Sequence, residues 1–272
     1  MTPGQRCIYC DSPADSKEHV IATRFIDLLS RDPRGLNLPA TLTVNVPSEP
    51  PRRIGGKKNN RGQPTLEFTT RVCEQCNNEW MNDIDTTAWP YVSEMIQGHQ
   101  VALDDAAREA IATWFMKVAI TARSVPHVGQ PIKREWAKSL YEHRSPIPGW
   151  QVWLGKFDGL APFWYNPQDV HFEIGQGVPP RVGHGKVIEP HGVLATCVIG
   201  YLIVQVLGID GVGVVDAPGE PALPLIWPGI RGVVSWPPRE YISDAGLPRW
   251  AQRHVGNPLA DLPTVSPRPR TS

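Results

Sequence analysis

The middle of the chain carries the clearest hydrophobic pattern. Between positions 106 and 119, apolar residues recur three or four places apart: Ala106, Ala110, Ile111, Trp114, Phe115, Val118 and Ala119. This spacing predicts an amphipathic helix, with Asp104 or Asp105 as its N-cap and Pro126 barring its continuation. A second helix is predicted over residues 133–143, which lie between two prolines.

After residue 145 the pattern changes to short apolar runs separated by Pro and Gly. These runs cover residues 150–154, 170–174, 193–207, 212–215 and 232–236. They are typical of strands joined by turns, and they predict a mixed or antiparallel sheet. One segment, 193–209, resembles a membrane span, but it contains Gln205 and Gly200 and falls short of the roughly 20 apolar residues that a spanning helix needs. A buried strand is the favoured interpretation.

These patterns predict an α+β protein with four stretches. Residues 1–90 hold two cysteine pairs among Pro-, Gly- and Arg-rich loops, and residues 91–145 form a helical segment. Residues 146–262 form a β-rich domain whose role the pattern does not indicate. The tail, 263–272, is rich in Pro, Ser and Arg and is expected to be disordered.

Composition limits how the chain could bind other molecules. Of its 272 residues, 41% are hydrophobic and 20% charged, which is enough apolar material for a packed core. The formal net charge is +0, which argues against binding DNA through overall positive charge. One local cluster without acidic residues is either a nucleic-acid contact or a solvated loop: Arg52, Arg53, Lys57, Lys58 and Arg61.

Four of the five cysteines form two pairs with two residues between them, Cys7/Cys10 and Cys73/Cys76. The start of the chain has no apolar signal-peptide core, so we expect a cytoplasmic protein in which such pairs bind metal rather than form disulfides. Four thiolates predict a structural zinc ion, and a redox role is the alternative. Cys197 lies in an apolar run and is predicted to be a buried core thiol.

The residues around these pairs resemble the HNH endonuclease superfamily. Glu18 and His19 stand between the pairs, before the apolar Val20, and Asn77 follows Cys76 directly. This order is similar to the endonuclease VII type of phage Holliday-junction resolvases, and the wider chain to uncharacterised phage and actinobacterial HNH proteins. The resemblance covers about a third of the chain. It implies a ββα-metal module, two strands and a helix, stapled by zinc.

The resemblance also implies a role for each residue. Glu18 and Asn77 would hold a catalytic Mg²⁺ or Mn²⁺, and His19 would be the general base. A histidine titrates near neutral pH and can take a proton from water, while a hard divalent ion held by few protein oxygens keeps positions open for phosphate. Adjacent side chains on a strand point to opposite faces, so a turn, a bulge or a strand end must bring Glu18 and His19 to one phosphate. Arg71 is a candidate phosphate clamp.

The chain departs from the family pattern in places. Many members have an Asn shortly before the second pair, which steadies the loop that carries the base. Here Thr69 or Thr70, or backbone hydrogen bonds, would do so. Many also have a second His or Asn one turn after the last ligand, where this chain has Met81, a poor magnesium ligand. Asp83 and Asp85 would reach the site only if the helix is short. Asn77 alone is also typical of a helix N-cap.

The sequence therefore predicts a metal-dependent endonuclease that hydrolyses DNA phosphodiester bonds, by nicking or by double-strand cleavage. Its expected partner is DNA, with no membrane, and homo-oligomerisation is left open. Two alternatives remain. One is a non-catalytic zinc-knuckle module that binds nucleic acid or protein. The other is a ligand-sensing protein with a nuclease effector module.

Overall fold

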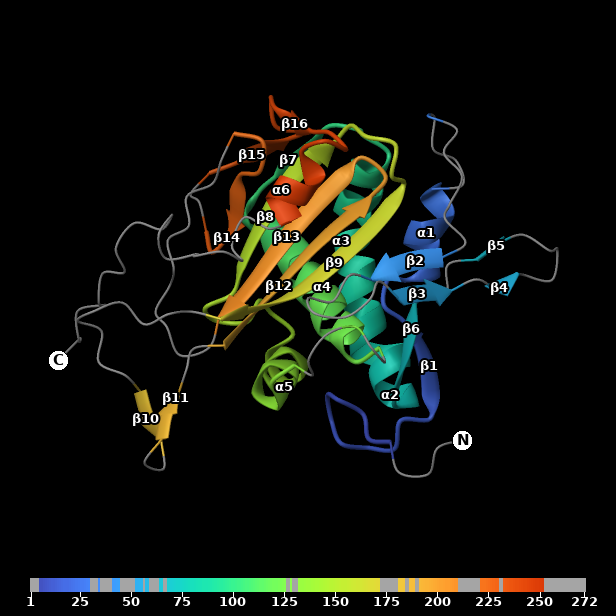
Figure 1. Ribbon diagram of the computed structural model, residues 1–272, viewed down its shortest axis with the longest axis vertical. Helices are drawn as coiled ribbons and strands as arrows, with labels where there is room; N and C mark the ends of the chain where they lie inside the picture. The colour runs from blue at the N-terminus through green and yellow to red at the C-terminus, as the bar shows by residue number, and fades with distance from the viewer. Residues whose placement is uncertain are drawn as a thin grey trace.

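The computed structural model describes residues 5–29, 34, 41–44, 52–55, 57–58, 64–65, 68–125, 128, 132–171, 181–183, 186–188, 191–209, 221–229 and 232–251. Helix α4 lies between a small N-terminal hairpin and a larger C-terminal sheet (Figure 1). The predicted combination of a helical middle and a β-rich C-terminal part is confirmed. The predicted tail and the strand predicted at 212–215 lie outside the described residues. So do residues 172–174, the last three of the strand predicted at 170–174.

The N-terminal part is built on an antiparallel pair, strands β1 (Ser16–His19) and β6 (Thr69–Val72). In their register, Glu18 faces Thr70 and His19 faces Thr69. A short helix, α1 (Thr23–Leu29), follows β1. Two further antiparallel pairs join β2 (Thr41–Val44) to β3 (Arg52–Gly55) and β4 (Lys57–Lys58) to β5 (Pro64–Thr65).

After β6 the chain is helical from residue 74 to residue 96. It begins as α2 (Glu74–Cys76), continues as a π-helical turn, η1 (Asn77–Met81), and ends as α3 (Asn82–Ile96). A π turn widens the helix locally, and such turns are frequent at functional sites. This helical run packs against α4, with α3 and α4 lying beside each other (Figure 1).

Helix α4 (Asp105–Arg123) confirms the prediction from periodicity. The Asp104 side chain caps it, accepting a hydrogen bond from the Ala107 amide at 2.8 Å, and the helix ends three residues before Pro126. The predicted amphipathic character is wrong, however, because nearly every residue from Ala107 to Arg123 is buried. The helix packs against α3 and β6 as well as the sheet, so it has no solvent face. The second predicted helix is α5 (Arg134–His143).

The larger sheet has the strand order β14-β8-β13-β12-β9, with β16 beside β8. Its neighbours are antiparallel except for the parallel pair β16–β8, as the turn-rich pattern predicted. The strands are β8 (Gln151–Phe157), β9 (Phe163–His171), β12 (His191–Ile199), β13 (Leu202–Ile209), β14 (Leu225–Trp227) and β16 (Tyr241–Ile242). Two smaller pairs join β7 (Val101–Leu103) to β15 (Val234–Trp236) and β10 (Arg181–Gly183) to β11 (Lys186–Ile188).

The run 193–209, predicted as one buried strand, is a hairpin of β12 and β13 that turns at Gly200. The backbone φ of Gly200 is +58°, in the left-handed region that glycine adopts without strain. A Cβ at this position would clash with the Ile96 carbonyl. The next amide, that of Tyr201, donates to the same carbonyl at 3.0 Å, so the turn is docked onto the end of α3. None of the described helices is long and apolar enough to span a membrane.

One continuous core joins the N-terminal hairpin, the helices and one face of the sheet. It runs from Cys7 and Trp80 through Trp114 to sheet residues such as Val204. Cys197 belongs to this core, as predicted, and burial raises the pKa of its thiol. The other sheet face has its own cluster around Trp153, covered by α6 (Leu247–Ala251).

Candidate active site

The two cysteine pairs meet at one point. The four sulfurs of Cys7, Cys10, Cys73 and Cys76 all lie within 4.8 Å of one another, and the Cys10 sulfur lies 3.3 Å from that of Cys73 and 3.6 Å from that of Cys76. Four sulfurs at the usual zinc–sulfur distance of about 2.3 Å would be about 3.8 Å apart at tetrahedral corners. The cluster therefore has the size of a tetrathiolate zinc site and could hold a zinc ion.

Local backbone geometry forms each half of this cluster. In the first pair, the Cys7 amide donates to the Ser12 carbonyl and the Asp11 amide donates back to the Cys7 carbonyl. In the second, the Cys73 sulfur caps α2, accepting a hydrogen bond from the Cys76 amide at 3.3 Å. The Glu74 amide also donates to the Asp15 carboxylate at 2.9 Å, which ties the start of α2 to the chain just before β1.

The electrostatics of the four sulfurs fit a cation at their centre. A hydrogen bond from Cys76 lowers the pKa of the Cys7 thiol to about 4, whereas the same contact and burial raise the pKa of Cys76. Burial also raises the pKa of Cys73. The cluster without a cation thus resists carrying several thiolates at once, and a divalent cation would offset their mutual repulsion.

The first cysteine pair is anchored to α4 by the tyrosine within it. Tyr9 is buried, and its hydroxyl lies 2.8 Å from the Thr121 hydroxyl. Its ring meets that of Trp80 edge to face, with the centroids 4.8 Å apart. Burial raises the pKa of the Tyr9 phenol, so it stays neutral. The cysteine cluster is therefore fixed against the middle of the molecule rather than attached by loops alone.

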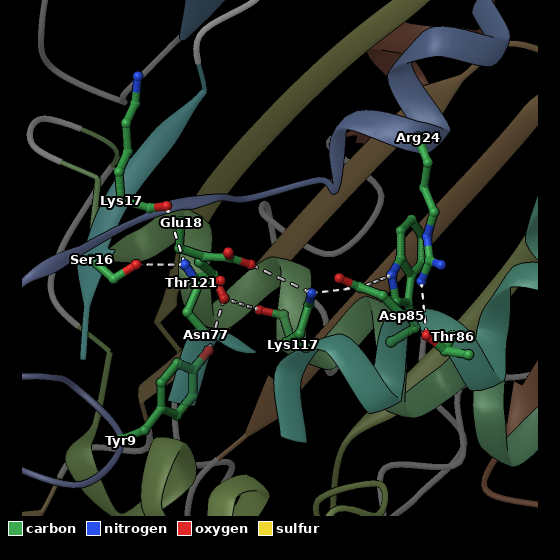
Figure 2. Close-up of polar contacts among 11 residues, drawn as sticks. Tyr9, Ser16, Lys17, Glu18, Arg24, Asn77, Asp85, Thr86, Lys117 and Thr121 are labelled. Atoms are coloured by element: carbon green, nitrogen blue, oxygen red, sulfur yellow. Dashed lines mark hydrogen bonds and ion pairs between the residues drawn. The ribbon is translucent and has the colours of Figure 1, made fainter. Parts of the chain in front are cut away.

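Asn77 joins the helical run to β1. Its side-chain amide group donates to the Ser16 hydroxyl at 2.8 Å and to the Lys17 carbonyl at 3.2 Å (Figure 2). Helix N-capping, the other interpretation of this residue, is wrong: the helical run begins at Glu74, and the Asn77 side chain donates hydrogen bonds to β1. Because Nδ2 is held by β1, the side-chain oxygen is the remaining donor atom for a metal.

Glu18 is a buried acidic group that lies near a buried lysine. It is 8% exposed, and its carboxylate lies 3.7 Å from the Lys117 ammonium, which lies 2.5 Å from the Asp85 carboxylate. Burial raises the pKa of Glu18 to about 7, with Lys117 opposing and Asp85 adding to the shift. Strand alternation puts Ser16 on the same face of β1 as Glu18, so Asn77 and Glu18 approach from the same side.

His19 is the last residue of β1 and is half-buried. By strand alternation its side chain leaves the hairpin on the face opposite to Glu18. The strand ends there and gives way to a bend at Val20 and Ile21, and the convergence of His19 and Glu18 on one phosphate stays a prediction. The Val20 amide donates to the Phe68 carbonyl at 2.9 Å, so a backbone bond holds this loop.

Thr69 and Thr70 are the two residues that could replace the missing Asn. Of the two, Thr70 makes a side-chain hydrogen bond that the structure describes, and that bond is not to the loop after β1. Thr70 exchanges hydrogen bonds with Ser124 at the end of α4, at 3.0 Å for each. This contact fixes the hairpin to the helix. Met81 is fully buried in the core.

The candidate nucleic-acid contacts are placed only in part. Arg71 is exposed on β6, opposite Lys17, on the same face of the hairpin as His19. The backbones of Arg52 and Arg53 lie in β3 and those of Lys57 and Lys58 in β4, but their side chains, and all of Arg61, lie outside what the structure describes.

Lys117 is the site residue that the sequence did not reveal. Apolar residues flank it in α4, so the sequence pattern indicates a core position for this part of the helix. The signal that could have found it is a polar stripe four residues apart, Thr113, Lys117 and Thr121, in an otherwise apolar helix. The sequence predicts that Asp85 reaches the site only if its helix is short. Helix α3 is 15 residues long, yet Asp85 contacts Lys117, which in turn lies beside Glu18.

Comparison with models of known protein families, with curated proteins and with solved structures finds no match to this chain. The structure itself supplies a four-cysteine cluster in a mixed α and β fold. Among the described residues, no other group of three or more His, Cys, Asp and Glu side chains is arranged to hold a metal ion.

Proposed function

We propose that this chain is a metal-dependent endonuclease of the HNH type that hydrolyses DNA phosphodiester bonds. The observation that carries the proposal is the contact between Asn77 and β1 beside the cysteine cluster. Zinc on the four sulfurs would fix the start of α2, and with it Asn77, against the strand that carries Glu18 and His19. Strand, strand and helix around one site is the arrangement that the motif implies.

The donor atoms suit a hard divalent ion. A Glu18 carboxylate oxygen and the Asn77 amide oxygen are the kind of ligand that Mg²⁺ and Mn²⁺ take. When bound, such an ion would polarise the scissile phosphate and stabilise charge on the leaving oxygen. Within the chain, His19 would take the proton from the attacking water, and Arg71 would bind a neighbouring phosphate oxygen.

Plasmid nicking tests the proposal. Zinc-loaded wild-type protein is assayed with Mg²⁺ or Mn²⁺ on supercoiled, branched, modified and single-stranded DNA, beside His19→Ala and His99→Ala. His99 is an exposed histidine paired with Glu94 and serves as the matched control. We expect metal-dependent cleavage that falls about 10²–10⁴-fold in His19→Ala, the usual contribution of a general base, and is unchanged in His99→Ala.

Two results would replace this proposal with its rivals. Wild-type protein that cuts none of these substrates better than His19→Ala, yet retains DNA or a protein partner, would indicate a non-catalytic zinc-stapled binding module. Cleavage that appears only when a small molecule is added would indicate a ligand-sensing protein with a nuclease effector.

A further inference from the structure

A buried ammonium group enters the candidate site from outside the predicted module. Lys117, on α4, has a fully buried side chain whose ammonium contacts Asp85 of α3 and Glu18 of β1 (Figure 2). The predicted module ends at residue 90, so the chain would bring this lysine back to the site from beyond the module. Figure 2 shows Glu18 and Asp85 on either side of the Lys117 ammonium.

Asp85 fixes the position of this ammonium. One Asp85 carboxylate oxygen accepts hydrogen bonds from Lys117 at 2.5 Å and from the Trp114 indole at 2.6 Å. Trp114 and Lys117 lie three residues apart on the same helix, so two neighbouring side chains of α4 hold one carboxylate. The ammonium lies farther from Glu18, at 3.7 Å, so Asp85 is its main partner.

The charges of this group leave one negative charge unbalanced. When Glu18 is ionised, Glu18 and Asp85 carry two negative charges and Lys117 one positive charge, all on residues 8% exposed or less. The Lys117 charge is largely satisfied by Asp85, so the Glu18 carboxylate keeps its attraction for a further cation. An unpaired lysine at this place would instead repel a divalent ion.

Resting on the function proposed above, we propose that Lys117 is a positioning residue for Glu18. Its ammonium lies 3.7 Å from one carboxylate oxygen of Glu18, which would leave the other oxygen for the divalent ion that Asn77 would share. Asp85 keeps the lysine in place and cancels its charge. A purely structural role is a weaker account, because the cost of desolvating a buried ion pair often exceeds the attraction within it.

The double variant Asp85→Asn/Lys117→Met tests this role in the full-length, zinc-loaded protein. It removes the ammonium and its counter-charge together, so the net charge of the pocket is unchanged and Trp114 keeps an acceptor. We expect a thermal midpoint near that of wild type, an unchanged KM for DNA, and a kcat for nicking that falls about 10–100-fold, the usual effect of losing a residue that orients a metal ligand. Half-saturation by Mn²⁺, followed by its electron paramagnetic resonance, should need about tenfold more metal.

A second buried pair from the same helix provides the matched control. Arg123 lies six residues after Lys117 on α4 and contacts Asp169 of β9 at 2.7 Å. The control variant Arg123→Met/Asp169→Asn should leave both kcat and Mn²⁺ binding at wild-type values. Asp85→Asn alone provides a second test, since it leaves Lys117 to neutralise Glu18. It should weaken Mn²⁺ binding more than the double variant does.

These measurements separate failure of this inference from failure of the proposed function. Wild-type protein that neither nicks DNA nor binds Mn²⁺ overturns both. Wild-type protein that nicks, with kcat and Mn²⁺ binding unchanged in the double variant or in Asp85→Asn, overturns only the role of Lys117. Equal losses in the double variant and its Arg123 control, each with a lowered thermal midpoint, assign Lys117 a structural role and overturn the inference as well.

Discussion

Replacing Glu18 by Gln should stabilise the protein at neutral and alkaline pH. The pKa of this buried carboxyl is about 7 in the folded protein against an ordinary value of 4.5, and the main cause is burial. The folded state therefore binds more protons than the unfolded state between these two values, so stability falls as the pH rises through this window. The full difference corresponds to about 3 kcal/mol, since one pH unit of pKa is worth about 1.4 kcal/mol.

The prediction concerns the change with pH rather than one value. Between pH 5.5 and pH 8, Glu18→Gln should gain about 2 kcal/mol of unfolding free energy relative to wild type, because the glutamine has no proton to lose. Urea unfolding followed by tryptophan fluorescence measures this difference, with zinc present and no Mg²⁺ or Mn²⁺ added. The substitution keeps the side-chain shape, so packing against Lys117 is retained.

Because His19 is adjacent to Glu18, the comparison is repeated in a His19→Ala background. The same change with pH should appear there, since it originates in Glu18. A stability difference that stays flat from pH 5.5 to pH 8, or that favours wild type at the higher pH, would refute the reasoning. It would mean that Lys117 holds Glu18 ionised throughout this range.

Three further substitutions, two of them with a control variant, test the cysteine cluster, its anchor to α4 and the turn of the sheet. Cys10→Ser should abolish binding of zinc, measured by metal analysis of purified protein, whereas Cys197→Ser should keep one ion per chain. Tyr9→Phe removes the hydrogen bond to Thr121 and should cost about 1 kcal/mol in urea unfolding while zinc stays bound; an unchanged midpoint would argue against this anchor. Gly200→Ala should cost about 2 kcal/mol or more, because of its left-handed backbone and the nearby Ile96 carbonyl, whereas Gly229→Ala, with open space around it, should cost less than about 1 kcal/mol in the same assay.

Local pattern was enough to predict two of the helices, α4 and α5, and the meeting of the cysteine pairs. Periodicity predicted α4 and the flanking prolines α5, and Asp104 and Pro126 indicated the limits of α4, because these signals act within one or two helical turns. The run 193–209 shows where such signals fail. A continuous apolar run does not reveal its own reversal, and only Gly200 indicated the turn.

The polar interior could not be predicted in the same way. Lys117 follows apolar neighbours in a helix, and nothing local indicates that Asp85 and Glu18 will face it from two other elements. Such contacts depend on how elements pack, which propensity and periodicity do not describe. The same holds for Thr70, which the sequence offered as support for the catalytic loop and which binds Ser124 instead.

The contacts of α4 also bear on how the cysteine cluster and the sheet depend on each other. The helix meets the N-terminal part through Thr121 and Lys117, and it also packs against β13 and β14 of the sheet. The buried core runs without interruption from Cys7 to Val204. A polar contact between a helix and a strand holds its geometry only while both are packed, so Glu18 depends on the sheet that supports α4. On this physical account, the β-rich region contributes to the candidate site by holding α4 and Lys117 in place, whatever else it binds.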